Sequence, residues 1–171
     1  STIANALLVR LLELGTRPVT LLDGDIVRKN LSSELGFSKA HRDLNVQRIG
    51  FVASEITKNG GIAICAPIAP YKGSRDIVRE GISAAGVFVE VHVSTPIETC
   101  EARDPKGLYQ RARKGQIPNF TGIDSPYEAP DQAECTLDTN ALPLEGCVMQ
   151  LREYLVTRGL ARPGRHAHAS T

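Results

Sequence analysis

The segment that most constrains this 171-residue chain is Val19-Thr20-Leu21-Leu22-Asp23-Gly24-Asp25, followed by a helix-like pattern. A short apolar run that ends in two acids predicts a buried strand, and its carboxyl end lies where open α/β sheets bind ligands. Two carboxylates there can hold a magnesium ion or accept a proton from a hydroxyl. The same residues also fit a plain acidic turn in which Asp25 caps the next helix. This segment alone does not decide between the two interpretations.

The chain opens with a helical pattern that runs from Ser1 to Leu12 and is closed by Gly15. Ser1 and Thr2 match the end of a phosphate-binding loop, G-x-x-x-x-G-K-[ST], although an N-cap serine explains Ser1 equally well. A helix that leads directly into a parallel-type strand implies an earlier strand. We therefore expect the first strand, and the glycines and lysine of such a loop, to precede Ser1.

The rest of the chain alternates between helical and strand patterns, which predicts an α/β fold of three layers around a parallel sheet. Predicted helices cover residues 26–33, 39–58, 75–85, 96–102 and 144–158, and predicted strands cover residues 62–66, 87–93 and 135–139. Residues 103–130 are rich in Lys, Arg, Gly and Pro, and so long an irregular segment is typical of a lid. We expect one domain over residues 1–164 and a disordered tail over residues 165–171.

Composition excludes several classes of protein. With 42% hydrophobic and 23% charged residues, and no apolar run of about 20 residues, a membrane span is not expected. A net charge of +1 gives no reason to expect nucleic acid or an anionic membrane as partner. The four cysteines show no paired spacing, and Cys65 and Cys135 are expected to be buried thiols in the cytoplasm.

Cationic and amide side chains gather near the start of the long helix. Arg42, Asn45 and Arg48 follow one another at intervals of three, and therefore share one helix face. Together with Arg28 they could form a wall that binds phosphate or sulfate oxygens. A solvated helix face explains the same spacing.

Six blocks in series resemble the adenylylsulfate (APS) kinase family. They are D-G-D-x-x-R at residues 23–28, L-G-F-S at 35–38, R-D-x-N-x-x-R-I-G at 42–50, A-P-Y at 69–71, R-D-x-K-G-L-Y at 103–109 and F-T-G-I-D-x-P-Y-E at 120–128. The resemblance implies a P-loop nucleotide kinase fold with a lid. It also implies transfer of the ATP γ-phosphate to the 3′-hydroxyl of adenosine 5′-phosphosulfate, with ATP as co-substrate and Mg²⁺ as cofactor.

The resemblance also assigns roles to particular residues. Asp25 would be the catalytic acid–base group, supported by Asp23, and Ser1 and Asp25 would bind Mg²⁺. The substrate would be held by Arg28, Phe37, Arg42, Asn45, Ile68, Ala69, Lys106, Asn119 and Phe120, with the two phenylalanines stacking on its adenine. ATP would be bound by Ser1, Thr2, Arg103, Thr139 and Leu142.

Two departures from the family pattern have consequences. Ala69 stands where some members carry a serine proposed to be phosphorylated, so any transfer here must be direct. The residues printed here lack the phosphate-loop glycines and lysine, and by themselves we expect them to be inactive. A homodimer, or fusion to ATP sulfurylase, is the expected assembly. The alternatives are a P-loop kinase for another small substrate and a non-catalytic nucleotide-binding module of a larger sulfate-activating protein.

Overall fold

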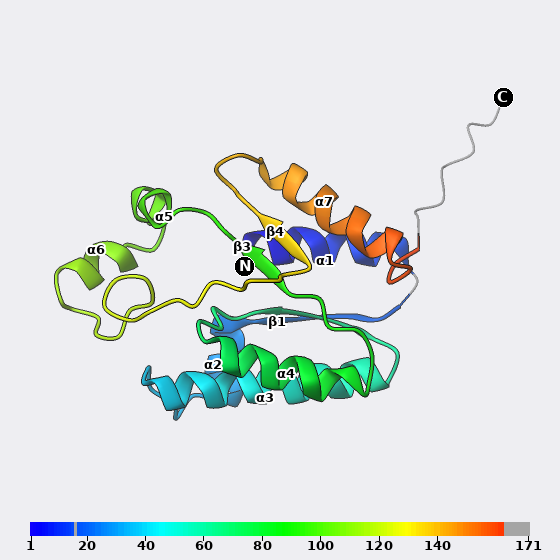
Figure 1. The fold of residues 1–171 in the computed structure, drawn as a ribbon, viewed down its shortest axis with the longest axis horizontal. Coiled ribbons are helices and arrows are strands. Elements are labelled where there is room, and N and C mark those ends of the chain that lie inside the picture. The colour runs from blue at the N-terminus through cyan, green and yellow to red at the C-terminus, as the bar shows by residue number, and fades with distance from the viewer. Residues whose placement is uncertain (16, 163–171) are drawn as a thin grey trace.

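The structure is a computed structural model, which describes residues 1–15 and 17–162. Its helices are α1 (Thr2–Leu14), α2 (Gly24–Leu31), α3 (Lys39–Lys58), α4 (Lys72–Ser83), α5 (Ile97–Arg103), α6 (Leu108–Arg113) and α7 (Leu144–Thr157). Its strands are β1 (Val19–Asp23), β2 (Ile62–Ala66), β3 (Val91–Val93) and β4 (Cys135–Leu137). Helices α1 and α7 lie on one side of the strands, and α2, α3 and α4 lie on the other (Figure 1).

The strands form two parallel pairs. β1 pairs with β2 from Val19 opposite Ile62 to Asp23 opposite Ala66. β3 pairs with β4, with Val91 opposite Cys135. Parallel strands interleaved with helices confirm the predicted α/β class.

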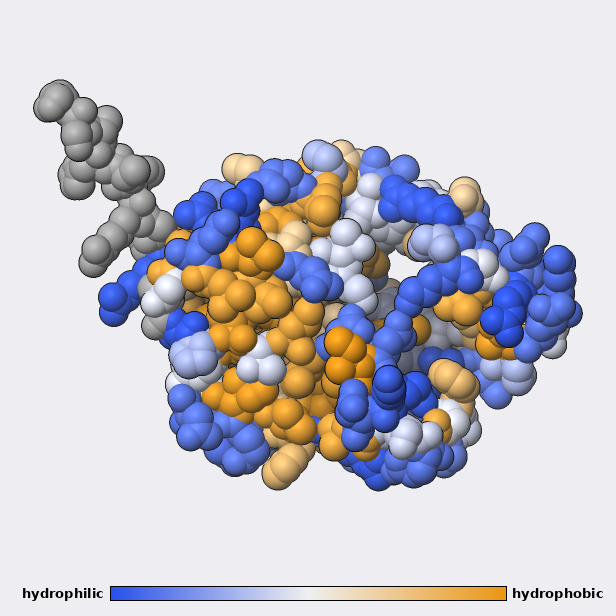
Figure 2. Space-filling view, turned by 180° about the vertical axis from the view of Figure 1, so that it is seen from behind, coloured by the Kyte–Doolittle hydropathy of each residue, from blue (hydrophilic) through white to orange (hydrophobic). Residues whose placement is uncertain are grey.

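An apolar cavity of about 440 Å³ separates the two pairs. It is lined by β2, by residues 87–91 and by side chains of the flanking helices, among them Leu7, Leu11 and Ile49. Strands of a parallel sheet are normally covered on both faces. Val91 and Val93 are instead 38% and 48% exposed. Figure 2 shows hydrophobic side chains gathered in one broad area of the rear face.

The buried core lies between α1, α7 and β4. Leu7 and Leu11 of α1 pack with Leu137 of β4 and with Cys147 and Leu151 of α7. The apolar positions of α1 and α7 recur at helical spacing, and these faces therefore meet over the strand. Gly15 ends α1 in the left-handed conformation, with φ of 61°, as predicted for a glycine C-cap.

Several predicted boundaries were wrong. Of the strand predicted over residues 87–93, only β3 forms, because β4 pairs with it over three residues and no strand in the described part of the chain pairs with residues 87–90. The strand predicted over residues 135–139 likewise ends at Leu137. α4 begins at Lys72 rather than residue 75, and the lid segment contains a short helix, α6.

Cys65 is not the buried thiol that was expected, whereas Cys135 is buried. Cys65 lines the cavity, so its surface is accessible while protein atoms surround it. The surrounding protein atoms desolvate the thiol of Cys65, and this raises its pKa to about 12.

Within the residues that the structure describes, no helix is both long and apolar enough to span a membrane. The tail predicted over residues 165–171 lies outside the described residues.

Candidate functional site

The acidic turn lies where β1 ends and α2 begins. Asp23 is the N-cap of α2 and accepts hydrogen bonds from the backbone N–H groups of Asp25 (3.0 Å) and Ile26 (3.5 Å). The capping acid is therefore Asp23, and the suggestion that Asp25 caps the helix was wrong. Glycine suits position 24 of this turn, because a Cβ there would lie only 3.1 Å from the carbonyl oxygen of Ala66, the last residue of β2.

Asp23 also contacts the start of α1. The hydroxyl of Ser1 donates to Asp23 Oδ2 at 2.5 Å, although 22 residues separate them. This hydrogen bond, and then those from the backbone N–H groups of Asp25 and Ile26, lower the pKa of Asp23 against the opposing effect of its burial. Asp23 is therefore an ionised, buried acceptor that joins the first helix to the acidic turn.

Asp25 does not cap the helix. It projects from the first turn of α2 with its side chain 78% exposed. Its partner is Lys106 of the lid, whose Nζ lies 2.6 Å from Asp25 Oδ2. This hydrogen bond raises the pKa of Lys106. Near Lys106, the carboxylate of Asp104 accepts hydrogen bonds from the N–H groups of Tyr109 (3.1 Å) and Gln110 (3.0 Å) at the start of α6. The structure thus brings together two predicted site residues that are 81 positions apart.

Two guanidinium groups lie near the ring of Phe37. The Cζ of Arg28 is 4.6 Å from the centre of its ring and that of Arg42 is 5.6 Å away, which is within the range of cation–π attraction. Arg28 is anchored by Nη1, which donates to the carbonyls of Leu35 (2.9 Å) and Gly36 (3.1 Å). The ring itself remains 52% exposed. An exposed aromatic ring with cations nearby suits a ligand that is both flat and anionic.

Arg42 joins helix α3 to the lid. Its Nε donates to the carbonyl of Phe37 at 2.9 Å, its Nη1 donates to Thr121 Oγ1 at 2.9 Å, and its Nη2 donates to the carbonyl of Asn119. Burial lowers the pKa of Arg42. The predicted anion-binding arginine is therefore also a tether between the two phenylalanine-bearing loops.

Asn45 lies one turn further along α3 and is buried. Its Oδ1 has no hydrogen-bond partner in the described part of the chain. A buried acceptor without a partner costs free energy unless a ligand or water donates to it. Arg48, on the same predicted face, is paired instead with the Leu31 carbonyl (3.0 Å) and Glu34 (2.5 Å), away from this group.

The loop that carries Phe120 is shaped by Asp124. Its carboxylate accepts from the N–H groups of Asn119 (2.8 Å) and Phe120, and Asn119 takes the left-handed φ of 57°. The Phe120 ring packs edge-on against Tyr109, with centroids 5.1 Å apart and planes at 72°. Phe120 is therefore held by the lid itself, and Phe37 by the arginines.

Two further predicted groups lie at other edges of the site. Ile68 is 61% exposed in the loop after β2, and Ala69 next to it adopts a φ of 44°. Arg103 of α5 donates to Thr139 at both Oγ1 (2.6 Å) and the carbonyl oxygen (3.0 Å). Leu142 packs against the α1–α7 core, and Thr2 begins α1.

Sequence reasoning gave no role to Asp104, Asp124, Glu128 or Arg75. The first three stand inside the blocks R-D-x-K-G-L-Y and F-T-G-I-D-x-P-Y-E, so a signal for them was present. Arg75 stands outside those blocks. Among the described residues, no group of three or more His, Cys, Asp or Glu side chains could hold a metal ion.

Comparison with known proteins places these features in a family. A family model described as adenylylsulphate kinase matches residues 1–138. A sulfate adenylyltransferase of Aspergillus oryzae is 52% identical over 157 residues, covering 92% of this chain and 27% of that protein.

Two solved structures share the fold. The hexameric APS kinase from Thiobacillus denitrificans has a TM-score of 0.72 and 52% identity, covering 94% of this chain and 27% of that one. An APS kinase of Mycobacterium tuberculosis in complex with AMPPNP and APS has a TM-score of 0.85 and 37% identity, covering 90% of this chain and 88% of that one. The predicted P-loop kinase fold is confirmed. The chain spans about a quarter of the length of the Aspergillus oryzae relative.

Proposed function

This chain belongs to the adenylylsulphate kinase family, and we propose that it transfers the γ-phosphate of ATP to the 3′-hydroxyl of adenosine 5′-phosphosulfate (APS). The products are 3′-phosphoadenosine 5′-phosphosulfate and ADP. The observation that carries this proposal is the convergence at the end of β1, where the exposed Asp25 meets the lid lysine and its neighbour Asp23 meets the start of α1.

Asp25 is proposed as the general base of the transfer. The 3′-oxygen of APS forms a bond to the γ-phosphorus, while the bond from that phosphorus to the bridging oxygen of ADP breaks. The hydroxyl proton passes to the Asp25 carboxylate. Phosphoryl transfer depends mainly on positioning and charge neutralisation, so an exposed carboxylate at a fixed turn is sufficient protein chemistry.

Magnesium fits the oxygen donors present at this turn. Mg²⁺ prefers carboxylate, hydroxyl and phosphate oxygens, and Ser1 Oγ and the Asp23 carboxylate already lie 2.5 Å apart. We propose that Ser1, Asp23 and Asp25 hold the ion directly or through water, where it would neutralise charge on the ATP phosphates.

APS is proposed to bind between α3 and the lid. Phe37 and Phe120 would stack on its adenine, and Arg28 and Arg42 have further N–H groups for its phosphosulfate oxygens. The partnerless Oδ1 of Asn45 supports a donor from the substrate at this place. Ile68, Ala69 and Asn119 complete the proposed wall of this site.

Lys106 has two proposed partners during the cycle. It neutralises Asp25 while the site is empty, and it turns to the phosphosulfate when the substrate enters. The two charges attract the same ammonium group, so substrate binding would free the Asp25 carboxylate for the 3′-hydroxyl.

ATP is proposed to bind on the opposite side of the turn. Arg103, fixed by its two hydrogen bonds to Thr139, would pack on the adenine, and the backbone near Leu142 would contact the same base. Ser1 and Thr2 at the start of α1 would contact its phosphates.

The cavity between β2 and β3 supports one further element. An apolar parallel strand would fill it and complete the sheet, and a phosphate-binding loop would then lead from that strand into α1. We propose that the active protein carries this strand before Ser1. We also propose that the protein is cytoplasmic. The hexameric APS kinase and the sulfate adenylyltransferase among its relatives support the further proposal that it works as an oligomer or joined to ATP sulfurylase.

The test uses the protein at its natural length. Purified protein is incubated with ATP, Mg²⁺ and APS, and the 3′-phosphorylated product is identified by mass spectrometry. Gluconate, shikimate and nucleoside monophosphates serve as competing acceptors. We expect product from APS and from none of the competing acceptors. An Asp25→Asn variant should still bind APS but transfer the phosphate more slowly by at least about 100-fold. Transfer to another acceptor in preference to APS would refute the proposed substrate.

A second candidate is a non-catalytic nucleotide-binding module. It is favoured by the sulfate adenylyltransferase of Aspergillus oryzae, in which the matching region is 27% of the protein. Calorimetry separates the two candidates: binding of APS and ADP without any turnover would support the module and contradict the kinase.

A further inference from the structure

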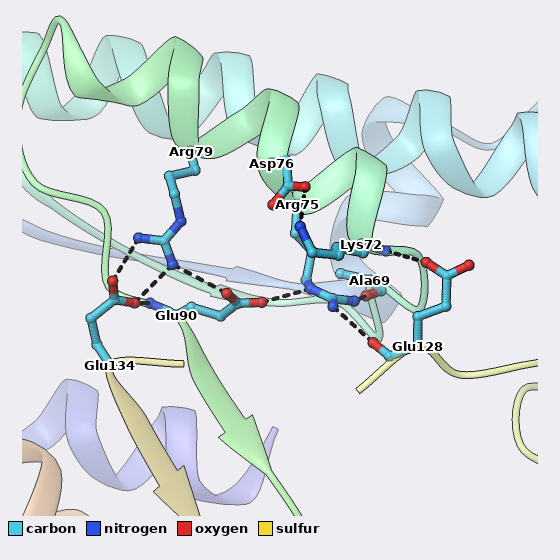
Figure 3. A network of polar contacts seen from close by, with 8 residues as sticks. All are labelled: Ala69, Lys72, Arg75, Asp76, Arg79, Glu90, Glu128 and Glu134. Atoms are coloured by element: carbon cyan, nitrogen blue, oxygen red, sulfur yellow. Dashed lines mark hydrogen bonds and ion pairs between the residues drawn. The ribbon is translucent and has the colours of Figure 1, made fainter. Parts of the chain in front are cut away.

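Arg75 is a buried cation that contacts three separate parts of the chain. It lies in the first turn of α4 and is 8% exposed. Figure 3 shows its guanidinium group between the Ala69 loop, the Glu128 backbone and the Glu90 carboxylate. A buried guanidinium needs a partner for each polar edge, so its position defines the positions of all three segments.

The first contact is with the loop after β2. Arg75 Nη1 donates to the carbonyl oxygen of Ala69 at 2.9 Å. Ala69 has a φ of 44°, in the left-handed region that residues with a Cβ rarely adopt. Such a conformation persists only where surrounding contacts hold it. Arg75 is one of the contacts that hold the loop in this form.

The second contact is with the end of the lid. Arg75 Nη2 donates to the carbonyl oxygen of Glu128 at 2.7 Å. Glu128 is also joined to the loop directly, because its N–H donates to the Pro70 carbonyl (2.8 Å) and its carboxylate accepts from the N–H of Lys72 (2.6 Å). These hydrogen bonds connect the end of the lid, at Glu128, to the same loop that Arg75 contacts.

The third contact balances the charge. Arg75 Nε lies 2.6 Å from Glu90 Oε1, as an ion pair rather than an aligned hydrogen bond. Glu90 is itself paired with Arg79 at 3.1 Å, and Arg79 with Glu134 at 2.6 Å. This row of alternating charges connects α4 to the segments that enter β3 and β4.

We propose that Arg75 is a positioning residue for the acceptor substrate. It sets the separation between the Ala69 loop and the end of the lid, and thereby the width of the APS site, without touching the reacting atoms. The substrate identity in this inference rests on the proposed function. The tethering of the two segments does not.

The experiment compares three variants of the natural-length protein. Arg75→Met removes both backbone contacts. Arg75→Lys keeps the charge but lacks the two Nη groups that reach the carbonyls of Ala69 and Glu128. Arg79→Met is the matched control, because Arg79 belongs to the same row of charges yet bonds neither Ala69 nor Glu128.

For Arg75→Met we expect the KM for APS to rise about tenfold or more, with kcat and the KM for ATP within about twofold. Arg75→Lys should recover part of the loss. Arg79→Met should lower the melting temperature while leaving the KM for APS unchanged. Equal effects of Arg75→Met and Arg79→Met on all three kinetic constants would show a merely structural role and overturn the inference.

Hydrogen exchange provides a readout that needs no substrate. Amides of the non-proline residues within 67–71 and 119–130 should exchange faster in Arg75→Met, or in Arg75→Lys if the first variant fails to fold, but not in Arg79→Met. Unchanged exchange in both segments would overturn the tether. If the unaltered protein does not act on APS, the proposed function fails, while the exchange result still decides whether Arg75 holds the two segments.

Discussion

The Asp124 carboxylate offers a quantitative test of how the lid loop is built. It accepts two backbone N–H groups, from Asn119 at 2.8 Å and from Phe120. The carbonyl of Phe120 in turn accepts from the N–H groups of Ile123 (3.1 Å) and Ser125 (3.2 Å). Hydrogen bonds to both the N–H and the carbonyl group of Phe120 thus hold the proposed adenine-stacking residue within a closed loop.

The Asp124→Ala variant removes two hydrogen bonds to an exposed carboxylate. At about 1 kcal/mol of net stability for each bond, the closed loop loses about 2 kcal/mol. A difference of that size corresponds to about a 30-fold change in an equilibrium constant. Apparent APS affinity falls with the fraction of protein whose loop is closed, so its Kd should rise by up to about 30-fold.

Two measurements check this prediction. Calorimetry gives the Kd for APS, and hydrogen exchange at the Ile123 and Ser125 amides reports opening of the loop itself. Asp124→Asn keeps one acceptor oxygen and should show about half of the free-energy loss. Glu153→Ala, which removes a carboxylate from α7, is the matched control. If neither exchange nor affinity changes in Asp124→Ala, the proposed role of this carboxylate in shaping the loop is refuted.

Three other predictions follow from single contacts. Phe37→Ala should weaken APS binding about tenfold while Phe37→Tyr preserves it, since stacking on a base contributes about 1–3 kcal/mol; calorimetry that finds equal affinities would contradict the stacking role. The hydrogen bond from Arg79 lowers the pKa of Glu134, whose ordinary value is 4.5. The stability from this pair is therefore complete above that value and is lost as the pH falls through the lowered pKa. In urea titrations, Arg79→Met should be less stable than the unaltered protein at neutral pH, with the difference shrinking in acid; a constant difference would oppose this. Finally, the Cys65 thiol, with its pKa raised to about 12, should react with iodoacetamide at pH 8 at least about 100-fold more slowly than a peptide thiol, and rapid labelling seen by mass spectrometry would show that it ionises readily.

Sequence patterns predicted the elements well wherever a pattern is local. The long helix α3 has its predicted ends, Lys39 and Lys58, because a capping serine precedes it and Asn59-Gly60 follows it. Strand boundaries failed where they depend on a neighbour, as in residues 87–90, because a strand requires a hydrogen-bonded partner that periodicity does not reveal.

The site shows the same division. The acidic turn, the two phenylalanines and the lid were predictable as residues, because each belongs to a short block with its own signature. Their connections were not predictable, because Lys106 meets Asp25 across 81 positions and Arg42 meets Asn119 across 77. The capping of α4 by Glu128, 56 positions away, likewise has no local signal.

The sequence by itself determined the order of helices and strands outside the lid, the family and the identity of the proposed site residues, since these depend on backbone preferences and spacing over a few positions. Only the tertiary structure decided which acid caps α2, which acid stays exposed, and how Arg42 and Arg75 join the lid to the body. Those outcomes depend on side chains brought together by packing from distant parts of the chain, and their free energy exists only once the surrounding segments are in place.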